Sequence, residues 1–163
     1  MYKIIKSDDY KDNKQLYLNL IDELFKNDDD KLANINEINE HLDFLFNNNF
    51  NSFLILQIDN NKLISMINGY EYEEKSWCLF SLFTNKECRK NGYAEKILKL
   101  AIEEIKKTDY SKIIVGIEKD NIPSIKLHEK VGFKYDNCNW DDLAKGFPEN
   151  HLGYIYKSRW YYV

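Results

Sequence analysis

The chain has 163 residues, of which 44% are hydrophobic and 15% aromatic, and its formal net charge is −4 at pH 7. A chain of this length fits one domain and buries enough surface to fold without a disulfide or a structural metal. This composition is not typical of a disordered protein. The net charge speaks against nucleic acid as a partner and weakly favours an amine-bearing or cationic substrate.

The cysteines and the N-terminus indicate the compartment. Cys78, Cys88 and Cys138 are an odd number and form no CxxC pair, which suits a reducing environment better than a disulfide scaffold. The N-terminus "MYKIIKSDDYKDNKQ" has no apolar signal core, and no run of about 18 apolar residues occurs. We therefore expect a soluble, cytoplasmic protein with no membrane partner.

The first part of the chain predicts a strand, two helices and a β-hairpin. "YKIIKS" reads as a short strand, and residues 10–26 as a helix that the acidic "NDDDK" ends. Residues 35–48 predict a second helix, with Asn36 or Asn39 as its N-cap. Two strands, at residues 52–58 and 62–73, flank the turn "DNNK". The apolar residues of the first helix lie at mostly helical spacing: Leu16, Leu18, Leu20, Ile21, Leu24 and Phe25.

The second part predicts alternating strands and helices. "SWCLFSLF" shows no polar alternation, so we expect a central strand covered on both faces. Pro123 in a first helical turn and Gly132 as a C-cap delimit a short helix. The remaining elements are a helix at 92–107, a buried strand at 111–118, and closing strands at 133–137 and 153–163 around a polar loop with Pro148.

This order, β-α-α-β-β-β-α-β-α-β-β, predicts the fold class. Hairpins join three sequential strands, and a crossover helix then links two strands that should be parallel. No internal repeat or linker divides the chain. We expect a single α/β domain over residues 1–163, with a mixed, mostly antiparallel central sheet and helices on both faces.

The loop before the 92–107 helix predicts an anion site. The first amides of a helix have no partner within the helix and form the positive end of its dipole. Gly92 allows the backbone a positive φ and a close approach to a ligand, and Arg89 and Lys90 attract the same charge. The loop matches neither the GK[ST] phosphate loop nor G-x-G-x-x-G. We interpret it as a pyrophosphate cradle.

The spacing Arg89-x-x-Gly92-x-Ala94 resembles the acetyl-coenzyme A motif [QR]-x-x-G-x-[GA] of the GNAT N-acetyltransferase superfamily. "LFTNKECRKNGYAEKILKLAI" is similar to the strand, turn and helix of that family. "EKDNIPSIKLHEKVGFK" is similar to its second landmark, whose places are filled here by Asn121, Ser124, His128, Gly132 and Phe133. The resemblance covers roughly residues 79–135, and the preceding half fits only in its element order.

The resemblance implies a cofactor, acetyl-CoA, and the residues that bind it. The strand near Leu82 and its parallel neighbour near Ile117 would splay apart, and the pantetheine arm would pair with the first of them like an added strand. Asn121 and Ser124 would lie beside the arm. The backbone contacts would come from Leu82, Phe83 and Thr84, and the pyrophosphate contacts from Arg89, Lys90, Asn91, Gly92, Tyr93, Ala94 and Glu95.

The resemblance also implies catalytic candidates. His128 stands where many family members have a tyrosine that is proposed to protonate, or hydrogen-bond, the leaving thiolate, and a neutral histidine N–H can donate such a bond. The alternative is a helix-surface residue in an enzyme that needs no acid. The amine must lose a proton, and Glu71, Glu73 or Glu118 is the candidate base. The alternative for each is a solvated carboxylate.

The other chemistry-bearing residues point to no second site. His41 lies in an amphipathic helix and His151 in a polar loop, and neither pairs with cysteine or carboxylate at metal-ligand spacing, so we expect no metal. Cys88 stands beside Arg89, but direct transfer from a thioester needs no enzyme nucleophile. The aromatic tail, with Tyr154, Tyr156 and Trp160, fits a strand on the core, a cation–π wall or a dimer edge.

Three functions fit these observations. The first is N-acetyl transfer from acetyl-CoA to a primary amine of a small molecule or peptide, by a monomer or homodimer. The second is a non-catalytic acyl-CoA-binding or regulatory module, and the third is a plain nucleotide-binding domain. Residues 1–74 carry no motif that names the acceptor, so polyamines, aminoglycoside-like amines, ribosomal N-termini and amino acids all remain open.

Overall fold

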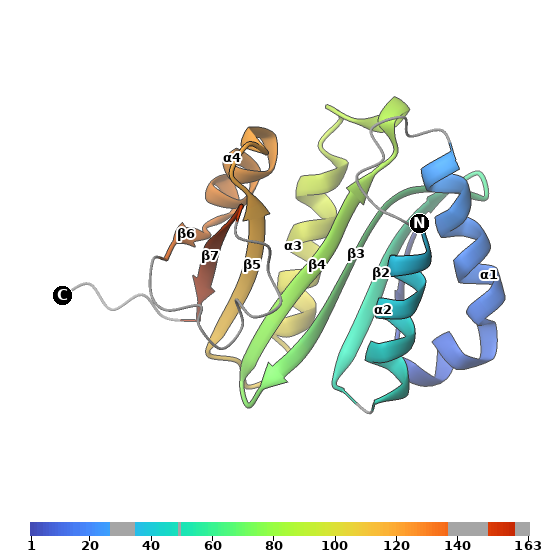
Figure 1. The fold of residues 1–163 in the computed structure, drawn as a ribbon, viewed down its shortest axis with the longest axis horizontal. Helices are drawn as coiled ribbons and strands as arrows, with labels where there is room; N and C mark the ends of the chain where they lie inside the picture. Colours follow the sequence, from blue (N-terminus) through green and yellow to red (C-terminus); the bar gives the residue numbers. More distant parts are fainter. Residues whose placement is uncertain (27–34, 49, 137–149, 159–163) are drawn as a thin grey trace.

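The structure, a computed structural model, describes residues 1–26, 35–48, 50–136 and 150–158 (Figure 1). The predicted order of strands and helices is confirmed, with one additional 3-10 turn, η1 (Lys86–Cys88). The strands are β1 (Tyr2–Ile5), β2 (Ser52–Asp59), β3 (Lys62–Glu73), β4 (Ser76–Thr84), β5 (Lys112–Glu118), β6 (Lys134–Tyr135) and β7 (His151–Lys157). The helices are α1 (Ser7–Lys26), α2 (Ile35–Asn47), α3 (Tyr93–Ile105) and α4 (Ile122–Val131).

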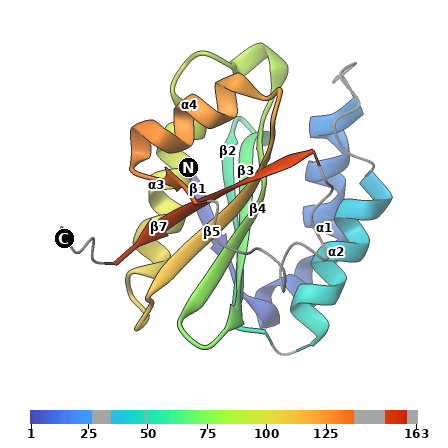
Figure 2. The ribbon, with the colours of Figure 1, turned by 60° about the vertical axis from the view of Figure 1, so that its left-hand side comes forward.

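The strands form one mixed sheet in the order β1-β2-β3-β4-β5-β7-β6, in which only β4 and β5 run parallel. Helices α1 and α2 cover one face, and α3 and α4 cover the other (Figure 2). The predicted fold class is confirmed, and β4 lies at the centre of the sheet as its apolar sequence indicates. None of the helices in the described residues is long and apolar enough to cross a membrane.

Because side chains alternate along the strands, the two faces of the sheet bury separate cores. On the α3 face, Phe53, Ile67 and Trp77 of the sheet pack against the apolar stripe of α3. On the opposite face, Leu54 and Met66 pack against α1 and α2. Packing in these cores holds the helices on the two faces of the sheet.

Helix α1 begins three residues before its predicted start and buries two tyrosines besides its apolar residues. Its buried residues are Tyr10, Tyr17, Ile21 and Leu24, whereas Leu16 is 54% exposed. The tyrosines bury their rings because their hydroxyl groups find partners at the edge of the core. Tyr10, for example, donates to Asp43 of α2 at 3.1 Å.

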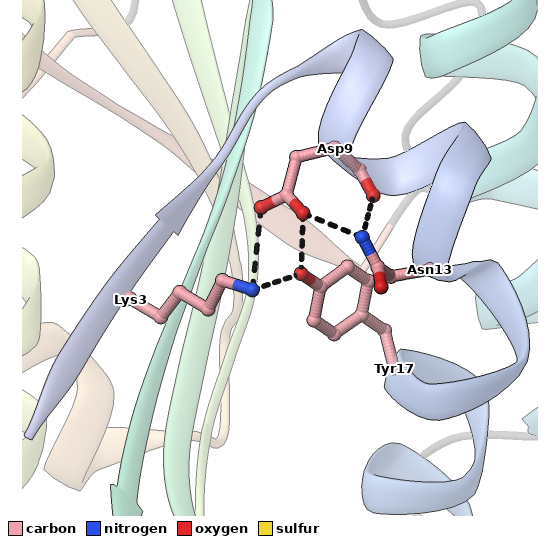
Figure 3. A network of polar contacts seen from close by, with 4 residues as sticks. All are labelled: Lys3, Asp9, Asn13 and Tyr17. Carbon is pink, nitrogen blue, oxygen red and sulfur yellow. Dashed lines mark hydrogen bonds and ion pairs between the residues drawn. The ribbon is translucent and has the colours of Figure 1, made fainter.

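A polar network bends α1 at Asn13, whose φ of −123° and ψ of 20° are not helical (Figure 3). The Asn13 amide donates to the Asp9 backbone oxygen at 3.1 Å and to Asp9 Oδ1 at 2.9 Å. Tyr17 donates to the same carboxylate at 2.8 Å, and Lys3 of β1 contacts both Asp9 and Tyr17. The network joins the first strand to both halves of α1.

Some sequence predictions need correction or lie outside the described residues. Helix α2 already includes Ile35, so Asn36 and Asn39 lie within it, and the prediction that either is the N-cap is wrong. The closing strand begins at His151, two residues earlier than predicted. The acidic "NDDDK", the Pro148 loop, Cys138 and Trp160 lie outside the described residues.

Candidate functional site

The parallel strands β4 and β5 pair for only three residues and then separate. The pairs are Ser76 with Lys112, Trp77 with Ile113 and Cys78 with Ile114. Strand β4 continues to Thr84, whereas the rest of β5 pairs with β7 on its other side. The β5-facing edge of β4 beyond Cys78 therefore has no ladder partner in the described part of the chain, which is the predicted splay.

A β-bulge in β4 accompanies this opening. Phe80 pairs with Asn68 and Phe83 with Met66, so two residues of β4 stand opposite one residue of β3. Ser81 lies in the bulge with a φ of 51°. A bulge bends its strand and increases the local twist. It therefore turns the end of β4 away from the path of β5.

The loop that follows β4 ends at the N-terminus of α3. Lys90 and Gly92 both have positive φ, 65° and 77°, and Gly92 is the N-cap of the helix. The first intrahelical bond runs from Lys96 N to Gly92 O at 3.1 Å. The amides of Tyr93, Ala94 and Glu95 come before that bond and point out of the helix end, as in any first turn.

The space over Gly92 fits a ligand. A Cβ built on this glycine meets no other atom within 4 Å, so the protein itself does not require a glycine for packing. What requires it is the φ of 77°, which other residues rarely adopt. An anion can therefore reach the backbone here, next to the exposed Lys90 and Asn91 side chains.

The loop is braced by its own side chains. Arg89 Nε donates to the Thr84 backbone oxygen at 3.1 Å, which ties the loop to the end of β4. The Asn91 amide donates to the backbone oxygens of Cys88 and Arg89, both at 3.1 Å. These bonds hold the carbonyl groups of the loop in place before the helix begins.

Helix α4 stands beside α3. The Asn121 side chain caps it by accepting from Ser124 N at 3.2 Å, and Gly132 ends it with a φ of 113°. Glu95 of α3 forms ion pairs with Lys99, at 2.8 Å, and with Lys130 of α4, at 2.6 Å. Hydrogen bonds from these lysines lower the pKa of the Glu95 carboxyl to about 2.

His128 is buried under α4, with 4% of its surface exposed, and its ring lies edge-on against Phe133. Its Nδ1 is 2.8 Å from the Ser124 backbone oxygen. Because a carbonyl oxygen only accepts, Nδ1 carries a proton, and in the neutral ring Nε2 is then an acceptor. Burial lowers the pKa of His128, partly offset by this hydrogen bond.

The structure does not gather the candidate carboxylates around the splay. Glu71 lies at the paired end of β3 and β4, where it accepts from Lys75 N at 2.8 Å and from the Asn51 amide at 3.1 Å. Glu73 is exposed in the same hairpin. Glu118 is exposed at the end of β5, and its backbone oxygen accepts from the N–H of Asn121, the N-cap of α4, so of the three candidates it is the one next to this helix.

The aromatic residues of β7 pack on the core. Tyr154 is 4% exposed and belongs to the core on the α3 face, and Tyr156 packs against that core beside Phe133. This is the arrangement expected for a strand that covers the core.

In the described part of the chain, several polar side chains that no motif marked have buried, unpartnered atoms on the α2 face, among them Asn39, Tyr72, His41 and Asn68. His41 Nε2 of α2 and both amide atoms of Asn68 of β3 are buried and have no hydrogen-bond partner among the described residues. The sequence signal for His41 is its place between Ile38 and Leu42 on the apolar stripe of α2. Asn68 interrupts an otherwise apolar central stretch of β3.

Comparison with known proteins gives the family of this architecture. Residues 14–133 match the model of the acetyltransferase (GNAT) family. A GNAT acetyltransferase from Staphylococcus aureus Mu50 superposes with a TM-score of 0.72 at 18% identity, covering 98% of this chain and 100% of that chain. The N-acetyltransferase PaiA of Thermoplasma acidophilum, solved with coenzyme A, has a TM-score of 0.64 at 12% identity, with coverage of 96% and 99%.

A third structure, a GNAT acetyltransferase from Elizabethkingia anophelis with acetyl-CoA bound, has a TM-score of 0.60 at 17% identity. It covers 72% of this chain and 82% of its own. No curated protein matches the chain. At these identities the solved structures establish the fold, and the family model establishes the family.

Proposed function

We propose that this chain, which belongs to the acetyltransferase (GNAT) family, transfers an acetyl group from acetyl-CoA to a primary amine of a small molecule or peptide. One observation carries the proposal: an unpaired edge of β4 leads directly into a loop and helix N-terminus where the backbone is open over Gly92. The solved relatives that hold coenzyme A or acetyl-CoA support the same cofactor here.

The residues of this region fit the two polar parts of such a cofactor. The amides of Gly92, Tyr93, Ala94 and Glu95 would bind the pyrophosphate, with Lys90 adding positive charge. The backbone groups of β4 from Leu82 to Thr84 would pair with the pantetheine amides as an added strand. Bound acetyl-CoA supplies the reactive acetyl thioester.

Helix α4 would border the cofactor on its other side. The Asn121 oxygen is used by its cap bond, which leaves the Asn121 Nδ2 donor for a ligand carbonyl. Ser124 contributes to the same helix turn, and its hydroxyl lies 3.3 Å from His128 Nδ1. Arg89 would act through its bond to Thr84, by holding the loop in the shape that binds the pyrophosphate.

His128 remains our candidate for assisting the departure of the thiolate, in a narrower form than the sequence suggests. With Nδ1 bonded to Ser124, only a ring protonated at Nε2 can donate to sulfur. If it does so, His128→Ala lowers kcat by tens-fold, at the low end of general acid effects of about 10²–10⁴, and leaves acetyl-CoA affinity unchanged. A wild-type kcat in this variant would assign His128 to packing alone.

The same hydrogen bond gives weight to the second candidate function, a non-catalytic acyl-CoA-binding module. A neutral His128 with Nδ1 already bonded has no N–H left for a leaving thiolate. Glu71, a candidate base, is likewise engaged by two donors. Thiol release with any amine excludes this alternative, whereas acetyl-CoA binding without turnover on the whole panel supports it.

Thermal unfolding with acetyl-CoA tests the cofactor. A ligand that binds only the native state raises its free energy of unfolding by about 2.7 kcal/mol at a hundredfold excess over its dissociation constant. We expect a rise in Tm with acetyl-CoA and a smaller rise with ATP, which lacks the pantetheine arm. An unchanged Tm at millimolar acetyl-CoA would exclude both the transferase and the binding module.

A further inference from the structure

On the α2 face of the sheet, aromatic rings run from the surface to the splay. Phe44 is 51% exposed and lies 5.3 Å from Phe50, ring centre to ring centre. Phe50 contacts Tyr70 at 5.5 Å, Tyr70 stacks on Phe80 at 5.4 Å, and Phe80 meets the His41 ring at 5.0 Å. We refer to these five residues as the aromatic wall.

The inner end of the aromatic wall lies at the opening between β4 and β5. Phe80 directly precedes the bulge residue Ser81 and packs in one cluster with Ile114 of β5 and Ile155 of β7. It therefore packs close to the last paired position of the two strands, Cys78 with Ile114, where the split begins. The pyrophosphate cradle belongs to α3, on the other face of the sheet (Figure 2), so a molecule on the wall would reach the splay from the opposite side.

Two unpartnered polar groups lie at this inner end. Asn68 is fully buried and stands opposite Phe80 in the β3–β4 ladder, on the same face. His41 packs its ring on Phe80 and has a buried Nε2. An unsatisfied buried polar group destabilises the fold, and two of them next to the same ring, that of Phe80, point to a polar ligand.

The charges around the wall limit what that ligand is. Asp43 of α2 already pairs with Lys14 at 2.7 Å and accepts from Tyr10. Glu71 at the far end of β3 accepts from Asn51 and Lys75. Polyamines and aminoglycosides carry several cationic groups, each of which needs a free carboxylate as its partner. The aromatic wall presents ring faces instead. It fits an amine attached to an aromatic or apolar body.

We infer that the aromatic wall is the acceptor site of the proposed transferase, where Asn68 orients the amine of an aromatic or apolar substrate and His41 Nε2 takes its proton. The inference rests on the proposed function. The amine nitrogen forms a bond to the acetyl carbon, the carbon–sulfur bond breaks with its electron pair going to sulfur, and the nitrogen's proton moves to Nε2 and then to solvent.

The environment of His41 supports this role. Burial lowers the pKa of its imidazole, so the ring is neutral at pH 7 and has a lone pair for a proton. The Tyr70 hydroxyl beside it does not compete as a base or an acid near neutral pH, because burial raises the pKa of Tyr70 to about 12. The Cys78 thiol beneath the same rings is also protonated, since burial raises its pKa.

The first test uses phenethylamine and spermidine as acceptors, with acetyl-CoA in excess. We expect phenethylamine to be acetylated with a kcat/KM about tenfold or more above that of spermidine. His41→Gln should lower kcat by about 100-fold, as for loss of a general base. His41→Phe, which keeps the ring packing, should lose the same activity. A preference for spermidine, or a wild-type kcat in both His41 variants, would overturn the inference.

The second test needs no turnover. Asn68→Leu removes a buried unsatisfied amide at similar volume, so it should raise the Tm of the ligand-free protein. It should also abolish the added protection by phenethylamine while keeping that by acetyl-CoA. His151→Gln and Asn19→Leu, which lie on β7 and on the exposed side of α1, are the matched controls and should behave as wild type.

The outcomes separate the two proposals. If acetyl-CoA does not shift the wild-type Tm, the proposed function fails. If acetyl-CoA protects and amines are acetylated, but Asn68→Leu keeps full activity and amine protection, only the acceptor-site inference fails. Loss of activity in Asn68→Leu together with a higher Tm is a combination that a purely structural role does not produce.

Discussion

At the scale of single residues, the loop before α3 depends on two backbone conformations that side chains disfavour. Lys90 and Gly92 both lie in the left-handed region, which costs a residue with a Cβ about 1–2 kcal/mol. Lys90 is therefore strained in the folded protein, whereas Gly92 has no Cβ and adopts the left-handed conformation without that strain. Since nothing in the protein fills the space over Gly92, two effects of replacing it can be separated: backbone strain and obstruction of a ligand.

We predict that Gly92→Val destabilises the ligand-free protein by about 1–2 kcal/mol and abolishes the thermal shift with acetyl-CoA. The stability loss comes from the φ of 77°, and the binding loss comes from the branched side chain over the helix amides. Urea unfolding measures the first effect, and isothermal titration with acetyl-CoA measures the second.

Gly92→Ala is the matched control, because it introduces the same strain with a single methyl group. Its stability should fall to a similar extent, while its acetyl-CoA affinity should remain well above that of the valine variant. If Gly92→Val binds acetyl-CoA as wild type does, the pyrophosphate lies elsewhere.

At the scale of elements, we attribute the separation of β4 from β5 to the bulge in β4. Without it, β4 would continue beside β5 past Cys78, and the edge proposed for the pantetheine arm would be occupied by a ladder. The bulge depends on Ser81, a non-glycine residue at a φ of 51°. Such strain persists where the surrounding structure fixes it, here the pairs Phe80–Asn68 and Phe83–Met66.

We predict opposite effects for two substitutions of Ser81. Ser81→Gly relieves the left-handed strain and should keep or slightly raise the Tm, with unchanged acetyl-CoA affinity. Ser81→Val, whose branched side chain disfavours this conformation, should cost about 1–2 kcal/mol and weaken acetyl-CoA binding, because β4 relaxes toward regular pairing. Thermal unfolding with and without acetyl-CoA measures both. Wild-type binding in Ser81→Val would show that the bulge does not hold the edge open.

The elements show what a sequence can and cannot predict here. All strands and helices were predictable in order, because each follows from local apolar periodicity and from glycine and proline positions. The kink at Asn13 and the bulge at Ser81 were not, because they depend on a side-chain bond to Asp9 and on a register mismatch between two strands. The apolar spacing of α1 did not indicate Tyr10 and Tyr17, which bury apolar rings behind polar hydroxyl groups.

The candidate site likewise has one part that the sequence predicts and one part that it does not. The proposed cradle could be predicted because Arg89, Gly92 and Ala94 lie within one local motif, for which we propose a role of the backbone amides. His41 and Asn68 come from α2 and β3, and each lies next to Phe80, His41 through a ring contact and Asn68 as the ladder partner. No spacing in the sequence records that contact.

At the scale of the whole molecule, a histidine packs against each face of the sheet; His128 is buried, and His41 is half-buried with its Nε2 covered. His128 packs under α4 on one face, and His41 packs under α2 on the other. Burial lowers the pKa of both imidazoles in the folded protein. Unfolding exposes them to water, where a histidine titrates at about 6.5. Folding is therefore linked to the protonation of both histidines.

The sign of this linkage gives the last prediction. Below about pH 6.5 the unfolded chain binds protons that the folded histidines do not bind. The contribution of these histidines to the free energy of unfolding therefore falls as the pH falls and levels off above that value. Each histidine contributes at most about 1.4 kcal/mol per pH unit. The pKa of the Glu95 carboxyl is lowered to about 2, so its contribution to the stability is lost mainly below pH 4.5, under the pH range of this experiment. Urea midpoints between pH 7.5 and 5 measure the effect.

Variants assign the slope to its residues. His41→Phe and His128→Leu remove one titrating group each, so each should flatten the fall in stability between pH 6.5 and 5, and the double variant should abolish most of it. A wild-type slope in the double variant would mean that other groups, and not these two imidazoles, control the acid stability of this fold.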